Sequence, residues 1–282
     1  MSYLFAGAPN EQLKTNITDF INVVLQGDLP TEVREIFFGG RLIALQKKDG
    51  GIRPIAVGYT LRRLAAKCAN AYVIKRRSDE LQPIQVGVGV SGGAEAAVHA
   101  MRRLVSSMPD DHVLVKLDFS NAYNSVRRDT VLESVADKMP ELYRFTHASL
   151  ACSPKLIYNT YTIESAEGSQ QGDPLSGLEF CEAVHPTLSE GSARTKLGYV
   201  DDFNLEQTNS NVVQDVQRIV NTQAKTGLVL NLQKCEIIAN NFDLIDQYSV
   251  FSQFQRVAKE DMTFLGSPVL PSRARTESCR AR

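Results

Sequence analysis

Two adjacent carboxylates, Asp201 and Asp202, interrupt an apolar segment of strand length that runs from Leu197 to Phe203. Neighbouring side chains of a flat strand point to opposite faces, so both carboxylates can share a site only where a hairpin turn relaxes the strand. Two carboxylates side by side also repel each other unless a cation lies between them. The segment therefore predicts a divalent metal, with Asp201 as the principal ligand and Asp202 as the second.

The composition allows a large folded core and argues against a strongly basic nucleic-acid module. The 282 residues are 43% hydrophobic, which suits one large domain or two subdomains. The formal net charge is -1, from 31 basic and 32 acidic residues, whereas a stand-alone nucleic-acid module is usually more basic. Any such contact must come from local basic clusters, although each cluster alone is better explained as a solvated helix face. These clusters are Arg62-Arg63, Lys75-Arg76-Arg77, Arg102-Arg103 and Arg127-Arg128.

Cysteine and histidine positions argue against structural zinc and against a disulfide framework. The five cysteines and four histidines are scattered without ligand spacing, so reduced thiols are expected. No apolar run reaches membrane-spanning length, and the N-terminus lacks a basic-then-apolar signal pattern. We therefore expect an intracellular protein of the cytoplasm, the nucleus or both, with no membrane partner.

Hydrophobic periodicity and turn residues predict mixed strands and helices. Two short apolar runs flank Asp49-Gly50-Gly51, a pattern typical of a β-hairpin. Thr130 and Glu133 fit a capping box for a helix that runs to Met139. From residue 112 onward, the order of elements predicts an α+β fold whose sheet carries its helices on one face. The expected elements are the hairpin at 41–45 and 52–57, helices at 60–78, 94–106, 130–139 and 212–220, a helix after 168–177, and strands at 112–119, 197–203, 228–230 and 235–239.

The sequence also predicts the character of two further segments and the buried face of one helix. Residues 1–30 are expected to be a polar leader with one amphipathic piece at 17–25. The glycine-rich stretch 87–93 lacks the Lys-Ser/Thr of a phosphate-binding P-loop, so it is interpreted as a plain loop before a helix. The apolar face of the helix at 60–78 is expected to consist of Leu61, Leu64, Ala65, Cys68, Ala71 and Tyr72.

A third carboxylate, Asp118, ends the apolar strand 113–117. A strand-end Asp often only caps the next turn. The alternative is that Asp118 lies opposite Asp201 on a neighbouring strand, so that the two strands contribute one carboxylate each. Magnesium takes a few carboxylates in a tight octahedron and completes it with substrate phosphates. Two ions roughly 4 Å apart can activate an attacking hydroxyl and stabilise a leaving oxygen.

Six motifs in order resemble those of reverse transcriptases, and their amino-acid sequences are most similar to those of the enzymes of non-LTR retrotransposons. Each motif alone carries a false-positive risk, but six in family order over about residues 41 to 269 leave little room for chance. The motifs are Lys47 to Ile55, Leu117 to Val126, Gln170 to Ser176, Tyr199 to Asp202, Gly227 to Glu236, and Phe264 to Gly266.

The resemblance implies roles for residues around the nucleotide. Tyr123, five positions after Asp118, would lie under the incoming sugar and exclude a 2′-hydroxyl, with Phe119 beside it in the nucleotide-binding set. Gln171 and Gly172 would shape the floor under the template–nucleotide pair, because glycine permits close backbone approach. An aromatic core residue remains the alternative for Tyr123.

The same resemblance implies roles for basic side chains and for the carboxylates. Lys48 and Arg53 would hold the triphosphate, as phosphoryl transfer requires, and Lys47 is an alternative to Lys48. Lys234 would protonate or neutralise the departing pyrophosphate. Asp118, Asp201 and Asp202 would be catalytic ligands of two Mg²⁺ ions, for which Mn²⁺ can substitute.

The implied architecture is the polymerase right hand with a ferredoxin-like palm sheet. It would comprise a leader at 1–30, a reverse transcriptase domain at 31–270 (31–110 mainly fingers, 111–270 mainly palm) and a disordered tail at 271–282, with the thumb missing or truncated. The implied partners are an RNA template, a DNA primer and deoxynucleotides, and the oligomeric state stays open. Two alternatives remain: a catalytically impaired remnant that only binds RNA or a partner, and an RNA-dependent RNA polymerase.

Overall fold

The computed structural model describes residues 10–47 and 50–270. Its larger sheet has the strand order β6-β7-β3-β8-β9. Neighbouring strands are antiparallel except β8 and β9, which are parallel. Central strand β3 is the apolar run that the sequence predicts: it is paired on both sides, and its residues 113–115 are fully buried. The strands are β3 (His112–Leu117), β6 (Thr195–Tyr199), β7 (Asp202–Thr208), β8 (Glu236–Ala239) and β9 (Gln255–Arg256).

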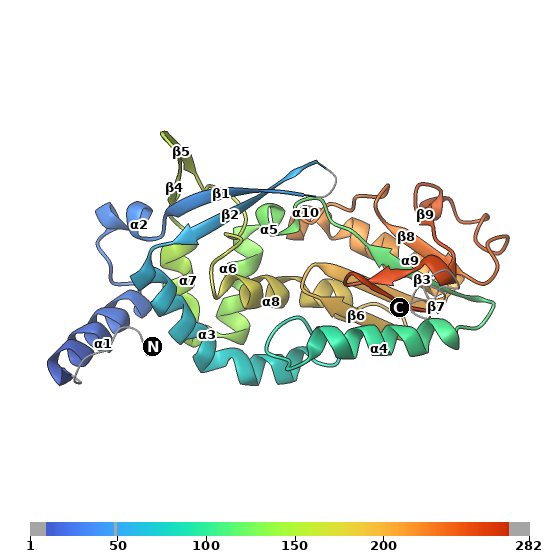
Figure 1. The fold of residues 1–282 in the computed structure, drawn as a ribbon, viewed down its shortest axis with the longest axis horizontal. Helices are drawn as coiled ribbons and strands as arrows, with labels where there is room; N and C mark the ends of the chain where they lie inside the picture. The colour runs from blue at the N-terminus through green and yellow to red at the C-terminus, as the bar shows by residue number, and fades with distance from the viewer. Residues whose placement is uncertain (1–9, 48–49, 271–282) are drawn as a thin grey trace, which may run out of the picture.

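Helices cover both faces of this sheet, so the expectation of helices on one face is wrong. Val113 and Val115 of β3 belong to the main core, together with apolar residues of α8 (Ser176–Ser189) and α9 (Asn209–Asn221). Leu114, on the opposite face, packs in a second core with α4 (Gly93–Ser106). The strand reads as apolar on both faces because both faces are covered. Figure 1 shows α4 running along the sheet at one side of the molecule.

A smaller sheet, in the order β2-β1-β4-β5, extends over the region between the two ends of the molecule (Figure 1). The predicted hairpin is confirmed: β1 (Gly40–Gln46) and β2 (Ile52–Gly58) pair antiparallel over their full length. Strand β4 (Lys155–Tyr158) joins β1 in parallel and pairs antiparallel with β5 (Tyr161–Glu164). The backbone N–H of Ala56 donates to the carbonyl of Gln171 (2.8 Å), which ties this sheet to the loop before α8.

Helix α3 (Thr60–Leu81) confirms the predicted helix but turns a different face to the core. Leu61 and Tyr72, expected inside, are exposed, whereas Arg62 and Arg77 are buried. Arg77 forms an ion pair with buried Glu182 of α8 (2.7 Å). The interpretation of these two arginines as solvated is therefore wrong, because each has a distant acidic partner that satisfies its charge.

Residues 10–30 contribute to the same core as the rest of the chain. Helix α1 (Glu11–Leu25) buries Ile21 and Val24, and Leu29 follows in the main core. Helix α1 contacts α3 and α7 (Tyr143–Leu150). Residues 10–30 of the predicted leader are therefore part of the packed structure. The other described elements are α2 (Thr31–Phe37), α5 (Ala122–Ser125), α6 (Arg128–Lys138), η2 (Pro140–Leu142), α10 (Gln223–Thr226), η3 (Ser249–Phe251), η4 (Lys259–Asp261), β10 (Thr263–Phe264) and β11 (Ser267–Pro268).

Two local predictions are wrong. Helix α6 begins at Arg128, two residues before the predicted capping box, and the Thr130 hydroxyl instead donates to the carbonyl of Lys225 (2.6 Å). The stretch 228–230 forms only an isolated bridge, between Leu230 and Phe119, and the Val229 carbonyl accepts a hydrogen bond from the Ser120 N–H after β3. No helix within the described residues combines the length and the apolar character needed to cross a membrane.

Candidate active site

The adjacent carboxylates lie at a hairpin turn, not in a continuous strand as the run 197–203 suggested. Tyr199 of β6 pairs with Asp202 of β7, which leaves Val200 and Asp201 as a two-residue loop. Val200 has φ +58°, a left-handed conformation that β-branched residues rarely adopt. The hairpin turn that would relax the strand geometry is thus present, with Asp201 at its tip.

Asp118 follows β3 at the same end of the sheet. Leu117 pairs with Phe203, so the next residue along β3 reaches the hairpin that carries Asp201. The carbonyl of Asp118 accepts a hydrogen bond from the Asn231 N–H (2.9 Å). Asp118 and Asp201 line one cleft of about 230 Å³. The cross-strand arrangement predicted for these two carboxylates is what the sheet register produces.

Most of the other predicted residues line this same cleft. Two cations, Arg53 and Lys234, lie in its wall with the two carboxylates. Lys48 lies outside the described residues, while its alternative Lys47 lines the cleft. The cleft wall consists of Lys47, Arg53, Pro54, Asp118, Phe119, Ser120, Asn121, Ala122, Tyr123, Asn124, Gln171, Asp201, Asn231 and Lys234.

Two predicted residues, Asp202 and Gly172, are not part of the cleft wall. Loss of water around the Asp202 carboxyl, together with the charge of Asp201, raises the pKa of Asp202 to about 6, although the residue reaches the surface. The neighbouring negative charge contributes to this rise after burial, and a bound divalent cation would offset that contribution. The ranking of Asp202 behind Asp201 as a metal ligand stays a prediction.

The donor set fits a magnesium ion that relies on its substrate. Within residues 10–47 and 50–270, no three or more His, Cys, Asp or Glu side chains are grouped so that they could hold a metal ion by themselves. Asp118 and Asp201 offer carboxylate oxygens to one polar cleft. Magnesium commonly binds one or two carboxylates and takes its remaining ligands from water and substrate phosphates. Two carboxylates in one polar cleft are compatible with a magnesium site of this kind.

Aromatic packing holds the floor of the cleft. The ring of Tyr123 stacks on Phe180 of α8, with centroids 4.5 Å apart and planes 11° apart. Phe119 meets Phe203 edge-on at 5.2 Å. Burial raises the pKa of the Tyr123 hydroxyl, so the phenol stays neutral at physiological pH. Tyr123 is therefore a rigid, uncharged surface in the cleft wall, consistent with either of the roles considered for it.

The loop that carries Gln171 and Gly172 lies against β2. Gly172 has φ +119°, and a Cβ atom there would lie 2.6 Å from the Ala56 carbonyl oxygen. Only glycine permits this approach. Gly172 thus lets the loop lie against β2, and the adjacent Gln171 lines the cleft.

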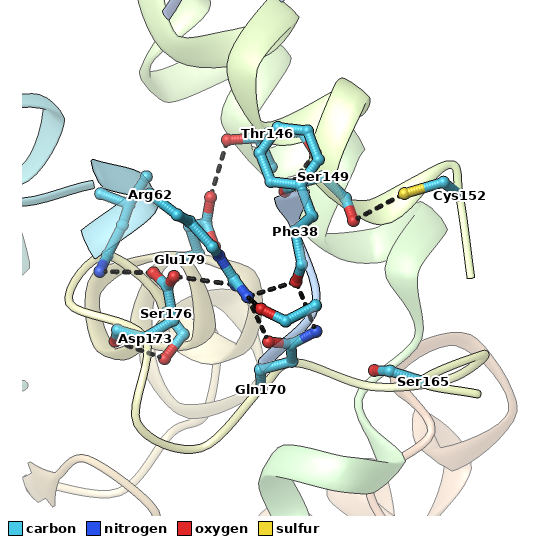
Figure 2. Close-up of polar contacts among 12 residues, drawn as sticks. Phe38, Arg62, Thr146, Ser149, Cys152, Ser165, Gln170, Asp173, Ser176 and Glu179 are labelled. Carbon is cyan, nitrogen blue, oxygen red and sulfur yellow. Dashed lines mark hydrogen bonds and ion pairs between the residues drawn. The ribbon is translucent and has the colours of Figure 1, made fainter. Parts of the chain in front are cut away.

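Buried Arg62 anchors this loop from the other side (Figure 2). Its guanidinium pairs with Asp173 (2.9 Å) and donates to the side-chain oxygen of Gln170 (2.6 Å). It also donates to the carbonyls of Phe38 and Gly39. One guanidinium therefore joins α3, the start of β1 and the loop that carries Gln171.

Comparison with known proteins identifies the family. Residues 45–269 match the family described as "Reverse transcriptase (RNA-dependent DNA polymerase)". The chain belongs to the reverse transcriptase family. It is 26% identical over 237 residues to the Retrotransposable element SLACS 132 kDa protein of Trypanosoma brucei gambiense. That match covers 80% of this chain and 20% of the relative, so the chain spans about one fifth of the relative's length.

Solved polymerases share the fold of this reverse transcriptase domain at low identity. Apo telomerase from Candida tropicalis has a TM-score of 0.55 at 16% identity, covering 73% of this chain and 44% of that one. Telomerase from Candida albicans has a TM-score of 0.55 at 12% identity, covering 76% and 43%. The RNA-dependent RNA polymerase of a human picobirnavirus has a TM-score of 0.51 at 15% identity, covering 71% and 42%. These likenesses establish the mixed α+β fold.

The sequence assigned no role to Asn231 or Gln85, although both contact the residues of the site. Asn231 lines the cleft and holds the Asp118 backbone, and its signal was present inside the motif Gly227 to Glu236. Gln85 bonds the Val200 backbone at the hairpin tip. It lies beside a stretch interpreted as a plain loop, and no local pattern connects it with residue 200.

Proposed function

We propose that this chain forms the fingers and palm of an RNA-directed DNA polymerase from a retrotransposon-like element. It adds deoxynucleotides to the 3′-hydroxyl of a DNA primer on an RNA template. The observation that carries the proposal is the meeting of Asp118 and Asp201 with Arg53, Lys234 and Lys47 in one polar cleft. Opposed carboxylates and cations are what metal-assisted phosphoryl transfer needs.

The division of labour follows the two sheets. Residues 31–110 form mainly the fingers, from which the β1–β2 hairpin projects toward the middle of the molecule (Figure 1). Residues 111–270 form mainly the palm, whose sheet carries the carboxylates. The hairpin reaches the cleft through Lys47, Arg53 and Pro54. Closure of the substrate between the two sheets excludes water from the reacting phosphate.

Asp118 and Asp201 would hold the Mg²⁺ ions, with Asp202 as a further ligand. When bound, two such ions activate the primer hydroxyl and stabilise the leaving pyrophosphate. Lys47 and Arg53 bind the triphosphate from the hairpin side, and Lys234 neutralises charge on the departing group. Lys48, the next residue in the sequence, stays a candidate for the same role.

Tyr123 and Phe119 bind the sugar. The stacked Tyr123–Phe180 pair is rigid, so a 2′-hydroxyl that meets the ring finds no space to displace it. Gln171 contacts the template–nucleotide pair while Gly172 lets the loop lie against β2. These contacts select deoxynucleotides that are correctly paired.

The test is incorporation of dTTP on poly(rA) primed with oligo(dT), with Mg²⁺. Asp118→Asn and Asp201→Asn each abolish incorporation with unchanged circular dichroism, because neither amide holds a divalent cation as a carboxylate does. Asp19→Asn, at an exposed position on α1, is the matched control and keeps wild-type activity. Activity that survives at position 118 or 201 would overturn the assignment of metal ligands. A wild-type protein that binds primed RNA without incorporation would instead be the impaired remnant.

An RNA-dependent RNA polymerase is the second candidate, because such an enzyme shares this fold. Tyr123 separates the two, since a polymerase of ribonucleotides must accommodate the 2′-hydroxyl. Comparing UTP with dTTP on the same primed poly(rA) decides between them. Equal use of both nucleotides would contradict selection of deoxynucleotides.

A further inference from the structure

We infer that Gln85 is a positioning residue that sets the orientation of Asp201 by bonding both backbone groups of Val200. This inference rests on the proposed function of the Asp118–Asp201 cleft. The carboxamide oxygen of Gln85 accepts from the Val200 N–H (2.8 Å). Its Nε2 donates to the Val200 carbonyl (3.1 Å).

The two bonds fix two consecutive peptide planes. The Val200 N–H belongs to the peptide before Val200, and the Val200 carbonyl belongs to the peptide that begins Asp201. Fixing both planes fixes φ and ψ of Val200, since these are the only soft dihedrals between them. The second plane contains the nitrogen and Cα atoms of Asp201, so the two bonds fix the point at the hairpin tip from which the Asp201 side chain extends.

Val200 needs such support because its conformation is unfavourable. A β-branched residue at φ +58° is strained, and such strain persists only where the surroundings over-determine it. Strain of this kind concentrates at active sites. Gln85, which lies outside the hairpin, stabilises this conformation through its two hydrogen bonds to Val200.

Gln85 is itself rigidly placed. Its side chain is 2% exposed. The backbone on either side of it bonds Gly198 of β6: Gly198 donates to Ile84 (2.7 Å) and accepts from Val86 (2.9 Å). The Gly87 N–H adds a second hydrogen bond to the Gln85 side-chain oxygen (2.9 Å). A buried side chain with fixed neighbours loses little further entropy when it holds a loop.

Two glycines leave space for this contact. A Cβ atom on Gly87 would lie 2.5 Å from the Val200 nitrogen, and one on Gly198 would lie 3.0 Å from Gln85 Nε2. The segment 84–87 is therefore shaped to approach the hairpin tip closely. Among the described residues, neither Gln85 nor Gly87 lines the cleft.

The test compares wild type with Gln85→Met, which keeps the side-chain length and loses both bonds. Hydrogen exchange read by mass spectrometry reports on the backbone at 199–202, whether or not the protein has polymerase activity. Mn²⁺ binding read by electron paramagnetic resonance reports on the carboxylates. We expect faster exchange at 199–202, Mn²⁺ affinity lower by roughly tenfold and kcat lower by roughly ten- to hundredfold, with the KM for dTTP within about threefold.

Two further variants complete the design. Gln207→Ala removes one side-chain bond to the Ser192 carbonyl at the other end of β7 and is the control for general destabilisation; it should leave exchange at 199–202 and Mn²⁺ affinity unchanged. Gln85→Asn keeps the amide but is one methylene shorter, and should reproduce the loss if Gln85→Met fails to fold. Unchanged exchange at 199–202 in the Gln85 variants would overturn the proposal that Gln85 holds the Val200 backbone. Faster exchange with wild-type Mn²⁺ affinity would overturn the positioning of Asp201, whereas absent wild-type incorporation bears only on the proposed function.

Discussion

Replacing Arg62 by Met tests how the loop that carries Gln171 is held. The Arg62 and Asp173 side chains are only 5% and 10% exposed, and their ion pair is 2.9 Å long. Removing the cation leaves a buried carboxylate without a partner, which costs about 3–5 kcal/mol. The carbonyls of Phe38 and Gly39 lose a donor as well. We therefore expect the free energy of unfolding of Arg62→Met to fall by about 3–5 kcal/mol.

The assay is urea unfolding followed by circular dichroism, with two comparison variants. In the double variant Arg62→Met with Asp173→Asn, the unpaired charge is gone, and the amide oxygen can still accept from the Leu175 N–H. That variant should lose only about 1–2 kcal/mol, the net worth of the missing hydrogen bonds. Arg76→Met, which breaks a solvent-exposed pair with Glu141, should lose at most about 1 kcal/mol. Equal losses for Arg62→Met and Arg76→Met would refute the reasoning.

Three further predictions concern pH, a backbone contact and nucleotide choice. Burial raises the pKa of Glu179 to about 7 from an ordinary 4.5, so the folded protein holds a proton that the unfolded chain loses, and stability falls as pH rises through this window. In Glu179→Gln, urea unfolding at pH 5 and pH 8 should show that fall reduced by up to roughly 3 kcal/mol, and an unchanged fall would contradict burial as its cause. Gly172→Ala should lose about 1–3 kcal/mol, because of the 2.6 Å approach to Ala56, whereas Gly266→Ala, with φ +77° but no atom within 4 Å of an added Cβ, should lose less; equal unfolding midpoints would count against the close approach. Tyr123→Ala should raise the use of UTP relative to dTTP by roughly tenfold or more, measured as a ratio of kcat/KM values, and an unchanged ratio would return Tyr123 to the role of a core aromatic.

The sequence predicted those parts of the site whose signals are local. The β1–β2 hairpin follows from its turn residues and flanking apolar runs. The meeting of Asp118 with Asp201 follows from two strand-end carboxylates and the motif order, and the sheet register bears it out. The turn at Val200 was foreseen only as a way to relax the strand, because a valine carries no turn signal.

The remaining parts depend on partners far away in the chain. Gln85 and Val200 are 115 residues apart, and Arg77 and Glu182 are 105 apart. A single sequence offers no local pattern for such pairs, so Arg77 was interpreted as solvated and Gln85 was given no role. Helix α3 shows the same limit: its apolar periodicity favoured Leu61 and Tyr72, but the ion pair with Glu182 makes burial of Arg77 tolerable.

The central claim is that Asp118 and Asp201 act together as the carboxylates of one metal site. Titration of Mn²⁺ into the protein, followed by electron paramagnetic resonance, measures this directly and needs no nucleic acid. We predict saturable binding by the wild-type protein and by Asp19→Asn, strengthened by dTTP because substrate phosphates complete the coordination. Asp118→Asn and Asp201→Asn should each lose that binding. Mn²⁺ affinity in either variant equal to that of the wild type would contradict the account.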